Sequence, residues 1–93
     1  MKEDAHPMHL NLPDEPGLEP ILHAVAEELA RQRRKWGRQD HDDGRWSLIA
    51  QEEAGEAAKA ALEDDPEALR AELIETAAVY ISWAAALERR ERE

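Results

Sequence analysis

Residues 76 to 87 read TAAVYISWAAAL and contain no charged side chain. A helix through this segment is apolar or small on every side, so it has no face suited to solvent. Such a helix must be covered all round, and a chain of 93 residues has few other elements to cover it. The segment therefore predicts an all-α protein in which short antiparallel helices form a four-helix-bundle-like core through oligomerisation, as a homodimer or a homotetramer.

Two more helices are predicted before this one. Pro20 suits the first position of a helix, and the apolar residues that follow share one face until Gly37 supplies a stop signal. The polar loop that follows ends where the next helical pattern begins. Asp65 as N-cap and Pro66 in the first turn begin the last helix. The predicted helices run from Pro20 to Gly37, from about Ser47 to Glu63, and from Pro66 to about Arg90.

The chain divides into an irregular N-terminal arm, residues 1–19, and a helical domain, residues 20–93. The arm is rich in proline and has no helical period. Met8, Leu10 and Leu12 alternate with polar residues, a pattern suited to an extended segment against another subunit, although arms of this kind are more often loose.

Composition excludes several classes of function. The 22 acidic and 12 basic residues give a net charge of −10, which argues against binding to nucleic acid or to an anionic membrane. There is no cysteine for a disulfide or a thiolate zinc site. No apolar run approaches the roughly 20 residues of a membrane span. We therefore expect a cytoplasmic, non-membrane protein.

Carboxylates interrupt the second predicted helix, in the stretch QEEAGEAAKA at residues 51–60. On a helical wheel Glu52, Glu53 and Glu56 follow an arc bounded by Leu48 and Ile49, so all three are predicted to point toward the core. The alternative is that they are partly solvated surface residues, since glutamate is a good helix former.

The third predicted helix also carries neighbouring carboxylates, Glu72 and Glu75, one turn apart. Antiparallel packing across the turn at residues 64–66 would bring the two sets face to face. Clustered carboxylates repel one another and need a cation, and hard oxygen ligands match Mg²⁺, with Mn²⁺ also possible. A ferritin-like di-iron site needs Glu-x-x-His pairs on the bundle helices, and the predicted helices have none.

Together these motifs resemble a known family. The pattern E-E-x-x-E at residues 52–56, followed by E-x-x-E at residues 72–75, is similar to the signature of the MazG-like all-α nucleoside triphosphate pyrophosphohydrolases, which are related to the dimeric dUTPases and dCTPases. The segment RRKWGRQDHDDGRW at residues 33–46 also resembles the one that precedes that motif. The resemblance covers roughly residues 25–87. It departs from the family at Glu75, where the family usually has aspartate, so the reach of that ligand differs.

The resemblance implies a Mg²⁺-dependent nucleotide pyrophosphohydrolase, an enzyme that cleaves a nucleoside or deoxynucleoside triphosphate to the monophosphate and pyrophosphate. It assigns the metal to Glu53, Glu56, Glu72 and Glu75. It also implies that Glu52 orients or deprotonates the attacking water. The competing hypothesis is a non-catalytic helical module, a degenerate homologue that binds a nucleotide or a protein.

Substrate-binding candidates precede the acidic motif and would come from a neighbouring subunit. A phosphate is expected at Lys35 or Arg38, stacking at Trp36 or Trp46, and hydrogen bonds to base or sugar at Gln39 and His41. Each has a structural alternative: Trp36 lies on an apolar helix face and suits the core, basic residues suit a helix C-terminus, and a loop histidine is usually solvated. The related dCTPases carry a similar Q-x-H, which favours a function for His41.

Overall fold

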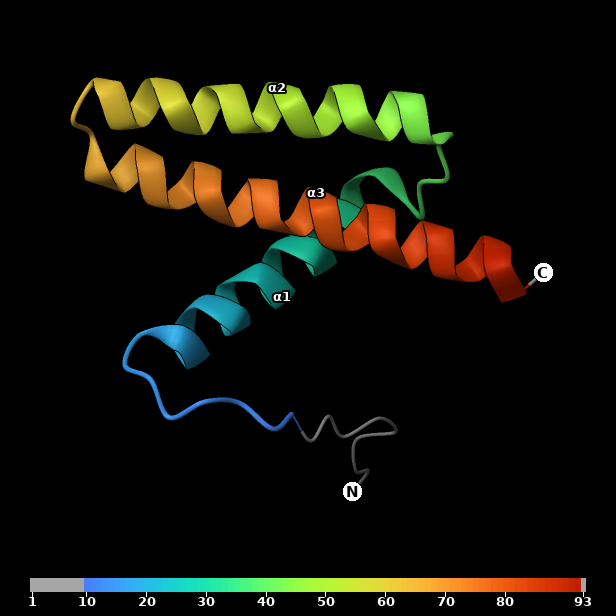
Figure 1. The fold of residues 1–93 in the computed structure, drawn as a ribbon, viewed down its shortest axis with the longest axis horizontal. Helices are drawn as coiled ribbons and strands as arrows, with labels where there is room; N and C mark the ends of the chain where they lie inside the picture. The colour runs from blue at the N-terminus through green and yellow to red at the C-terminus, as the bar shows by residue number, and fades with distance from the viewer. Residues whose placement is uncertain (1–9, 93) are drawn as a thin grey trace.

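The computed structural model describes residues 10–92, and within this range the chain forms three α-helices and no strand. Helix α1 spans Leu18–Trp36, α2 spans Asp43–Leu62 and α3 spans Pro66–Arg92. Helices α2 and α3 run side by side and antiparallel, and α1 crosses α3 obliquely on its other side (Figure 1). The predicted all-α class and the antiparallel pairing of the second and third helices are confirmed.

Two helices begin earlier than the sequence predicts. Helix α1 starts at Leu18 because Gly17, at φ 89°, turns the chain and its carbonyl accepts the Ile21 amide at 3.3 Å. Helix α2 starts at Asp43 rather than Ser47. Its N-cap is Asp42, whose Oδ1 accepts the backbone N–H of Arg45 at 2.8 Å. The last residues of the predicted polar loop therefore form the first turn of α2.

The turn between α2 and α3 has the predicted chemistry. Asp64 adopts a left-handed conformation with φ 57°, which ends α2. Asp65 then caps α3, since its Oδ1 accepts the Ala68 amide at 3.1 Å, and Pro66 is the first helical residue. This compact turn fixes the register of the two helices against each other.

The core lies between α2 and α3 and consists mostly of alanine. Its central cluster contains Trp46, Ala50, Val79 and Ala86, with Ile49 and Trp83 packed against it. Small side chains on both helices allow the two backbones to approach closely. The interface is therefore close-packed but buries little surface on each residue.

The charge-free segment of α3 is only partly covered. Ala78 is fully buried and Val79 is 7% exposed, whereas Tyr80 is 49%, Ile81 45% and Leu87 42% exposed. Within residues 10–92, α1 and α2 pack against two sides of α3 and leave a further apolar side open. Residues 10–92 alone therefore do not provide the cover that the charge-free segment requires.

Residues 10–17 precede α1, and Leu10 and Leu12 are exposed. The first nine residues of the predicted arm, Met8 among them, lie outside the described residues, as does Glu93 at the end of the domain. No helix in the described part of the chain is long and apolar enough to cross a membrane.

The alanine core makes a prediction for stability. Ala50 is 1% exposed at the α2–α3 interface, so Ala50→Leu should separate the helices and lower the free energy of unfolding by about 1–3 kcal/mol. The matched control is Ala58→Leu on the exposed side of α2, with an expected change within about 0.5 kcal/mol. Urea titrations of both variants measure the difference, and equal stability would contradict the close packing.

Candidate metal and substrate site

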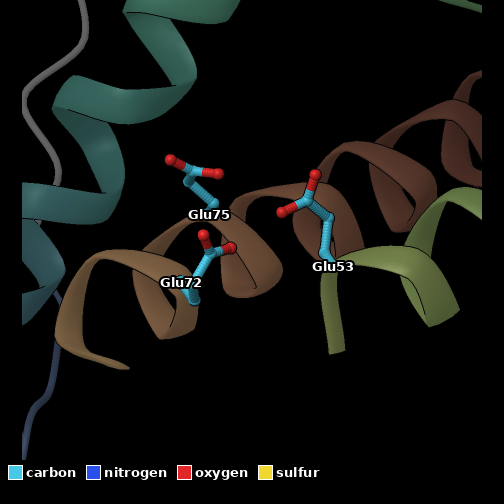
Figure 2. Close-up of side chains that lie close together, drawn as sticks. All are labelled: Glu53, Glu72 and Glu75. Carbon is cyan, nitrogen blue, oxygen red and sulfur yellow. The ribbon is translucent and has the colours of Figure 1, made fainter. Parts of the chain in front are cut away.

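Three glutamates meet where α2 and α3 face each other. Glu53 comes from α2, and Glu72 and Glu75 come from α3; one carboxylate oxygen of each lies within 4.8 Å of those of the other two. Figure 2 shows Glu53 reaching from α2 toward the pair on α3. All three side chains are half-buried. The expected meeting of the two acidic motifs is therefore present for these residues.

Local structure explains this convergence. Glu72 and Glu75 are three residues apart, so they share one side of α3. Glu53 lies on the same side of α2 as the core residues Trp46 and Ala57, which pack toward α3. Because alanines let α2 and α3 approach closely, Glu53 can reach Glu72 and Glu75 across the interface.

The cluster is electrostatically unfavourable without a cation. Burial, together with the charges of Glu75 and Glu72, raises the pKa of Glu53 from 4.5 to about 7. Burial and the charges of Glu75 and Glu56 also raise the pKa of Glu72. Two unit charges at the 4.8 Å limit repel by about 3 kcal/mol at an effective dielectric constant near 20.

The donor set fits a hard divalent cation. Glu72 Oε1 is buried and has no hydrogen-bond partner among the described residues. A buried acceptor without a donor costs free energy, which a bound cation would recover. Arg31 interacts with Glu75 through space, but its guanidinium is held by Glu28 in a bidentate pair at 2.9 and 2.7 Å. Carboxylate oxygens without histidine or cysteine suit Mg²⁺ or Mn²⁺.

A cavity of about 480 Å³ adjoins the glutamates. Glu53 and Glu75 line it together with Ile49, Trp46 and Val79, which form an apolar wall. Cavities of this size and mixed lining are typical of small-molecule sites. The cavity therefore offers an apolar surface next to an acidic cluster that suits a metal ion.

The loop between α1 and α2 forms another side of the cavity. Gln39 and His41 both line it, and the His41 Nε2 lies 3.3 Å from Gln39 Oε1. The His41 ring meets the Trp46 ring edge-on, with centroids 4.8 Å apart. Gln39 and His41 therefore lie beside the apolar wall of a cavity within one chain. That they also lie near the glutamates of another subunit stays a prediction.

Arginines gather around the cavity although the chain is strongly acidic. Five of them line it: Arg31, Arg33, Arg38, Arg45 and Arg89. Arg38 pairs with Asp40 at 3.2 Å, and both side chains are about half exposed. Positive charge is thus concentrated next to a cavity that also holds carboxylates, an arrangement suited to a phosphate together with a metal ion.

The predicted site residues fall into three groups. Glu53, Glu72 and Glu75 form the acidic cluster. Trp36, Arg38, Gln39 and His41 line the cavity together with Glu53 and Glu75. Lys35, Glu52 and Glu56 belong to neither group, although Glu56 is close enough to raise the pKa values of Glu53 and Glu72.

The prediction that Glu52, Glu53 and Glu56 all point toward the core is wrong for the first and the last, which are exposed. The predicted arc is bounded by Leu48 and Ile49, but Leu48 is 63% exposed. The buried face of α2 consists mainly of small residues and Trp46, displaced around the helix from Leu48. Glu53 alone of the three lies on that face.

The structure places the two stacking candidates differently. Trp36, for which the core was the alternative, is 53% exposed and lines the cavity, where Lys35 Nζ lies 4.8 Å from the centre of its ring. Trp46 is 2% exposed and belongs to the core cluster. Trp36 is the last residue of α1.

Sequence reasoning missed Arg89. Its Nη2 donates to Asp40 Oδ1 at 2.6 Å and lies 3.5 Å from the carbonyl oxygen of Gln39. In the sequence it is one of several basic residues near a helix C-terminus, where such residues are common. Nothing in the spacing links it to a loop some 50 positions earlier.

Comparisons with protein-family models, with curated proteins and with solved structures find no significant match to this chain. The function proposed below therefore depends on the geometry of the acidic cluster and the cavity, and on the two acidic motifs at residues 52–56 and 72–75.

The raised pKa of Glu53 predicts how stability depends on pH. The folded metal-free protein holds a proton on Glu53 up to about pH 7, whereas the unfolded chain releases it near 4.5. This contribution to stability is complete below the lower value and is lost as pH rises through the upper one. Thermal melts between about pH 8 and 5.5 should therefore show rising stability as pH falls.

The comparison variant is Glu53→Gln, which should weaken this pH dependence, while Glu63→Gln on the exposed end of α2 should retain it. Millimolar Mg²⁺ should stabilise the parent most at the alkaline end, because metal binding requires ionised carboxylates. The same pH dependence in the parent and in Glu53→Gln would contradict the raised pKa.

Proposed function

We propose that this protein is a Mg²⁺-dependent nucleotide pyrophosphohydrolase of the MazG-like type, acting on a nucleoside or deoxynucleoside triphosphate. The observation that carries the proposal is the convergence of Glu53, Glu72 and Glu75 within 4.8 Å beside a cavity. These residues come from both acidic motifs that carry the family resemblance. Neither motif alone would form such a cluster.

The proposed reaction is attack of water on the α-phosphorus, with cleavage of the bond to the bridging oxygen of the β-phosphate. The monophosphate and pyrophosphate leave as products. Glu53, Glu72 and Glu75 would hold Mg²⁺, with Glu56 at the edge of the cluster. When bound, the ion would offset phosphate charge and lower the pKa of water. Glu52, the residue before Glu53, is proposed to accept the proton of the attacking water.

The rest of the cavity suits the remaining parts of a nucleotide. Arg33, Arg38 and Arg45 would bind phosphate oxygens, since a guanidinium offers paired donors to such an anion. Trp36 presents an exposed ring for stacking on a base. Gln39 and His41 would donate or accept hydrogen bonds at base or sugar. Pyrophosphate release across a panel of nucleotides tests the proposal.

The first functional prediction concerns Glu53. With Mg²⁺ and the preferred nucleotide, Glu53→Gln should lower kcat/KM by about 100-fold or more, because a carboxylate ligand of the ion that would offset the phosphate charge is lost. Glu63→Gln is the control, since among the described residues Glu63 pairs with Lys59 alone, at 3.3 Å, and it lies outside the cluster. Its activity should stay within about twofold of the parent. Equal activity of the two variants would remove Glu53 from the mechanism.

The competing hypothesis is a non-catalytic module that binds a nucleotide or a partner protein. It shares the cavity and the arginines but needs no cation in the acidic cluster. Titration of nucleotide into the protein with and without Mg²⁺, followed by an assay for pyrophosphate, separates the two. Binding without release, under conditions in which Mg²⁺ stabilises the fold, would favour the module.

We also propose that α3 forms a helical bundle with a second copy of the chain. Its uncovered side has apolar or small residues at alternating spacings of four and three: Leu73, Ala77, Tyr80, Ala84 and Leu87. Leu73 is 54% and Tyr80 is 49% exposed. This spacing forms a continuous seam along a helix and is the pattern of side chains that pack between neighbouring helices.

The seam predicts a homodimer or a homotetramer. Light scattering after size exclusion should give an oligomer at micromolar concentration. The double variant Tyr80→Glu, Leu87→Glu should dissociate or unfold this oligomer, because it places charges in the middle and at the end of the seam. Ala58→Glu, on the exposed side of α2, is the control and should leave the mass unchanged. A stable monomeric parent would contradict the proposed bundle.

A further inference from the structure

Side chains near the end of α3 donate hydrogen bonds to the start of α2 and to the loop before it. Trp83 Nε1 donates to Asp43 Oδ1 at 2.9 Å, and Arg90 Nη2 donates to both carboxylate oxygens of Asp43 at 3.0 and 3.2 Å. These contacts hold α2 itself. The pair between Arg89 and Asp40 is different, because Asp40 belongs to the loop at residues 37–42.

The loop has little backbone support of its own. Among the described residues, its backbone hydrogen bonds lie at its two ends: the Gly37 amide donates to Arg33 O at 2.9 Å, and Asp42 O accepts the Trp46 amide at 3.0 Å. Within residues 10–92, no backbone–backbone hydrogen bond fixes residues 38–41. The position of these four residues therefore depends on side-chain contacts.

Arg89 makes contacts to this part of the loop from another element. Its Nη2 donates to Asp40 Oδ1 at 2.6 Å and approaches the Gln39 carbonyl oxygen at 3.5 Å. The bond from Arg89 lowers the pKa of Asp40. Arg89 is the more buried partner, with 29% of its side chain exposed against 53% for Asp40, and it also lines the cavity. The rigid helix thus holds the exposed loop.

The residues held in this way are the polar side chains of the cavity wall. Gln39 carries the carbonyl that Arg89 approaches, and His41 is the next residue but one. Their side chains contact each other, and the His41 ring contacts the buried Trp46 ring. A displacement of the loop would move both of them relative to the apolar wall and to Glu53.

We infer that Arg89 is a positioning residue, which fixes the loop 37–42 through Asp40 and the Gln39 carbonyl and thereby sets where Gln39 and His41 meet a bound substrate. The loop-fixing role stands on the contacts alone. The consequence for substrate selection rests on the proposed function. Arg89 acts on substrate through these two side chains, and so it should influence discrimination between nucleotides more than the rate of the chemical step.

The test compares Arg89→Ala with Arg92→Ala in the full chain. Arg92 is a matched control because it removes the same charge from the same end of α3, but its partner is Glu88 within the helix, at 3.0 Å. Backbone order parameters of residues 38–41, measured by NMR relaxation, should fall from rigid values of about 0.85 to below about 0.6 in Arg89→Ala and stay unchanged in Arg92→Ala, because the contact that holds the loop is lost only in the first variant.

Kinetics on a panel of deoxynucleoside and nucleoside triphosphates provide the second measurement. Arg89→Ala should raise KM for the preferred nucleotide about tenfold, leave kcat within about twofold, and narrow the difference between nucleotides. Asp40→Ala, a change of an exposed side chain that keeps Arg89, removes the same contact and also the pair between Asp40 and Arg38, so it should narrow the nucleotide preference in the same way. Adding Arg89→Ala to Asp40→Ala should change the preference little further, because the shared contact is already lost. Asp40→Ala also decides the matter if Arg89→Ala folds poorly.

Each outcome counts for or against the inference. Unchanged order parameters of residues 38–41 in both Arg89→Ala and Asp40→Ala, or fully additive effects of the two changes, would overturn it. Equal changes in kcat and kcat/KM with unaltered nucleotide preference would overturn the role in selection. If the parent releases pyrophosphate from no nucleotide, the proposed function fails, while the order parameters still decide whether Arg89 fixes the loop.

Discussion

The repulsion between Glu53, Glu72 and Glu75 is the constraint around which the structure is organised. One carboxylate oxygen of each lies within 4.8 Å of those of the other two, and burial together with the neighbouring charges raises the pKa of Glu53 to about 7. Apolar packing between α2 and α3 must offset this cost, because the carboxylates themselves push the helices apart. A site that destabilises its own fold is typical of residues retained for binding or chemistry.

The packing that opposes the repulsion is thin. The core between the two helices contains alanines and a few larger side chains, so each residue buries little apolar surface. Long-range polar contacts supplement it at the far end of the pair, where Trp83 and Arg90 bind Asp43. The exposed seam on α3 is further apolar surface, and the proposed packing against a second copy would add stability by covering it.

The cavity combines features that a uniformly acidic surface would not provide. Five arginines surround a space next to the glutamates, and the loop before α2 contributes Gln39 and His41. A net charge of −10 repels anions, and local positive charge from the arginines offsets this repulsion at the cavity. The arrangement separates two tasks: carboxylates for a cation, and guanidinium groups with polar loop residues for an anionic ligand.

The sequence by itself determined the helices, the turn at Asp64–Pro66 and the pairing of the two acidic motifs, because caps, turn residues and helical spacing act over a few positions. Only the tertiary structure decided which glutamates meet. The face of α2 that packs on α3 is set by small alanines, which give a weak signal on a helical wheel, and so Glu53 is half-buried while Glu52 and Glu56 are exposed. The same holds for Arg89 and Asp40, whose contact joins residues 49 positions apart and depends on where α3 ends relative to the loop. No local pattern encodes that distance.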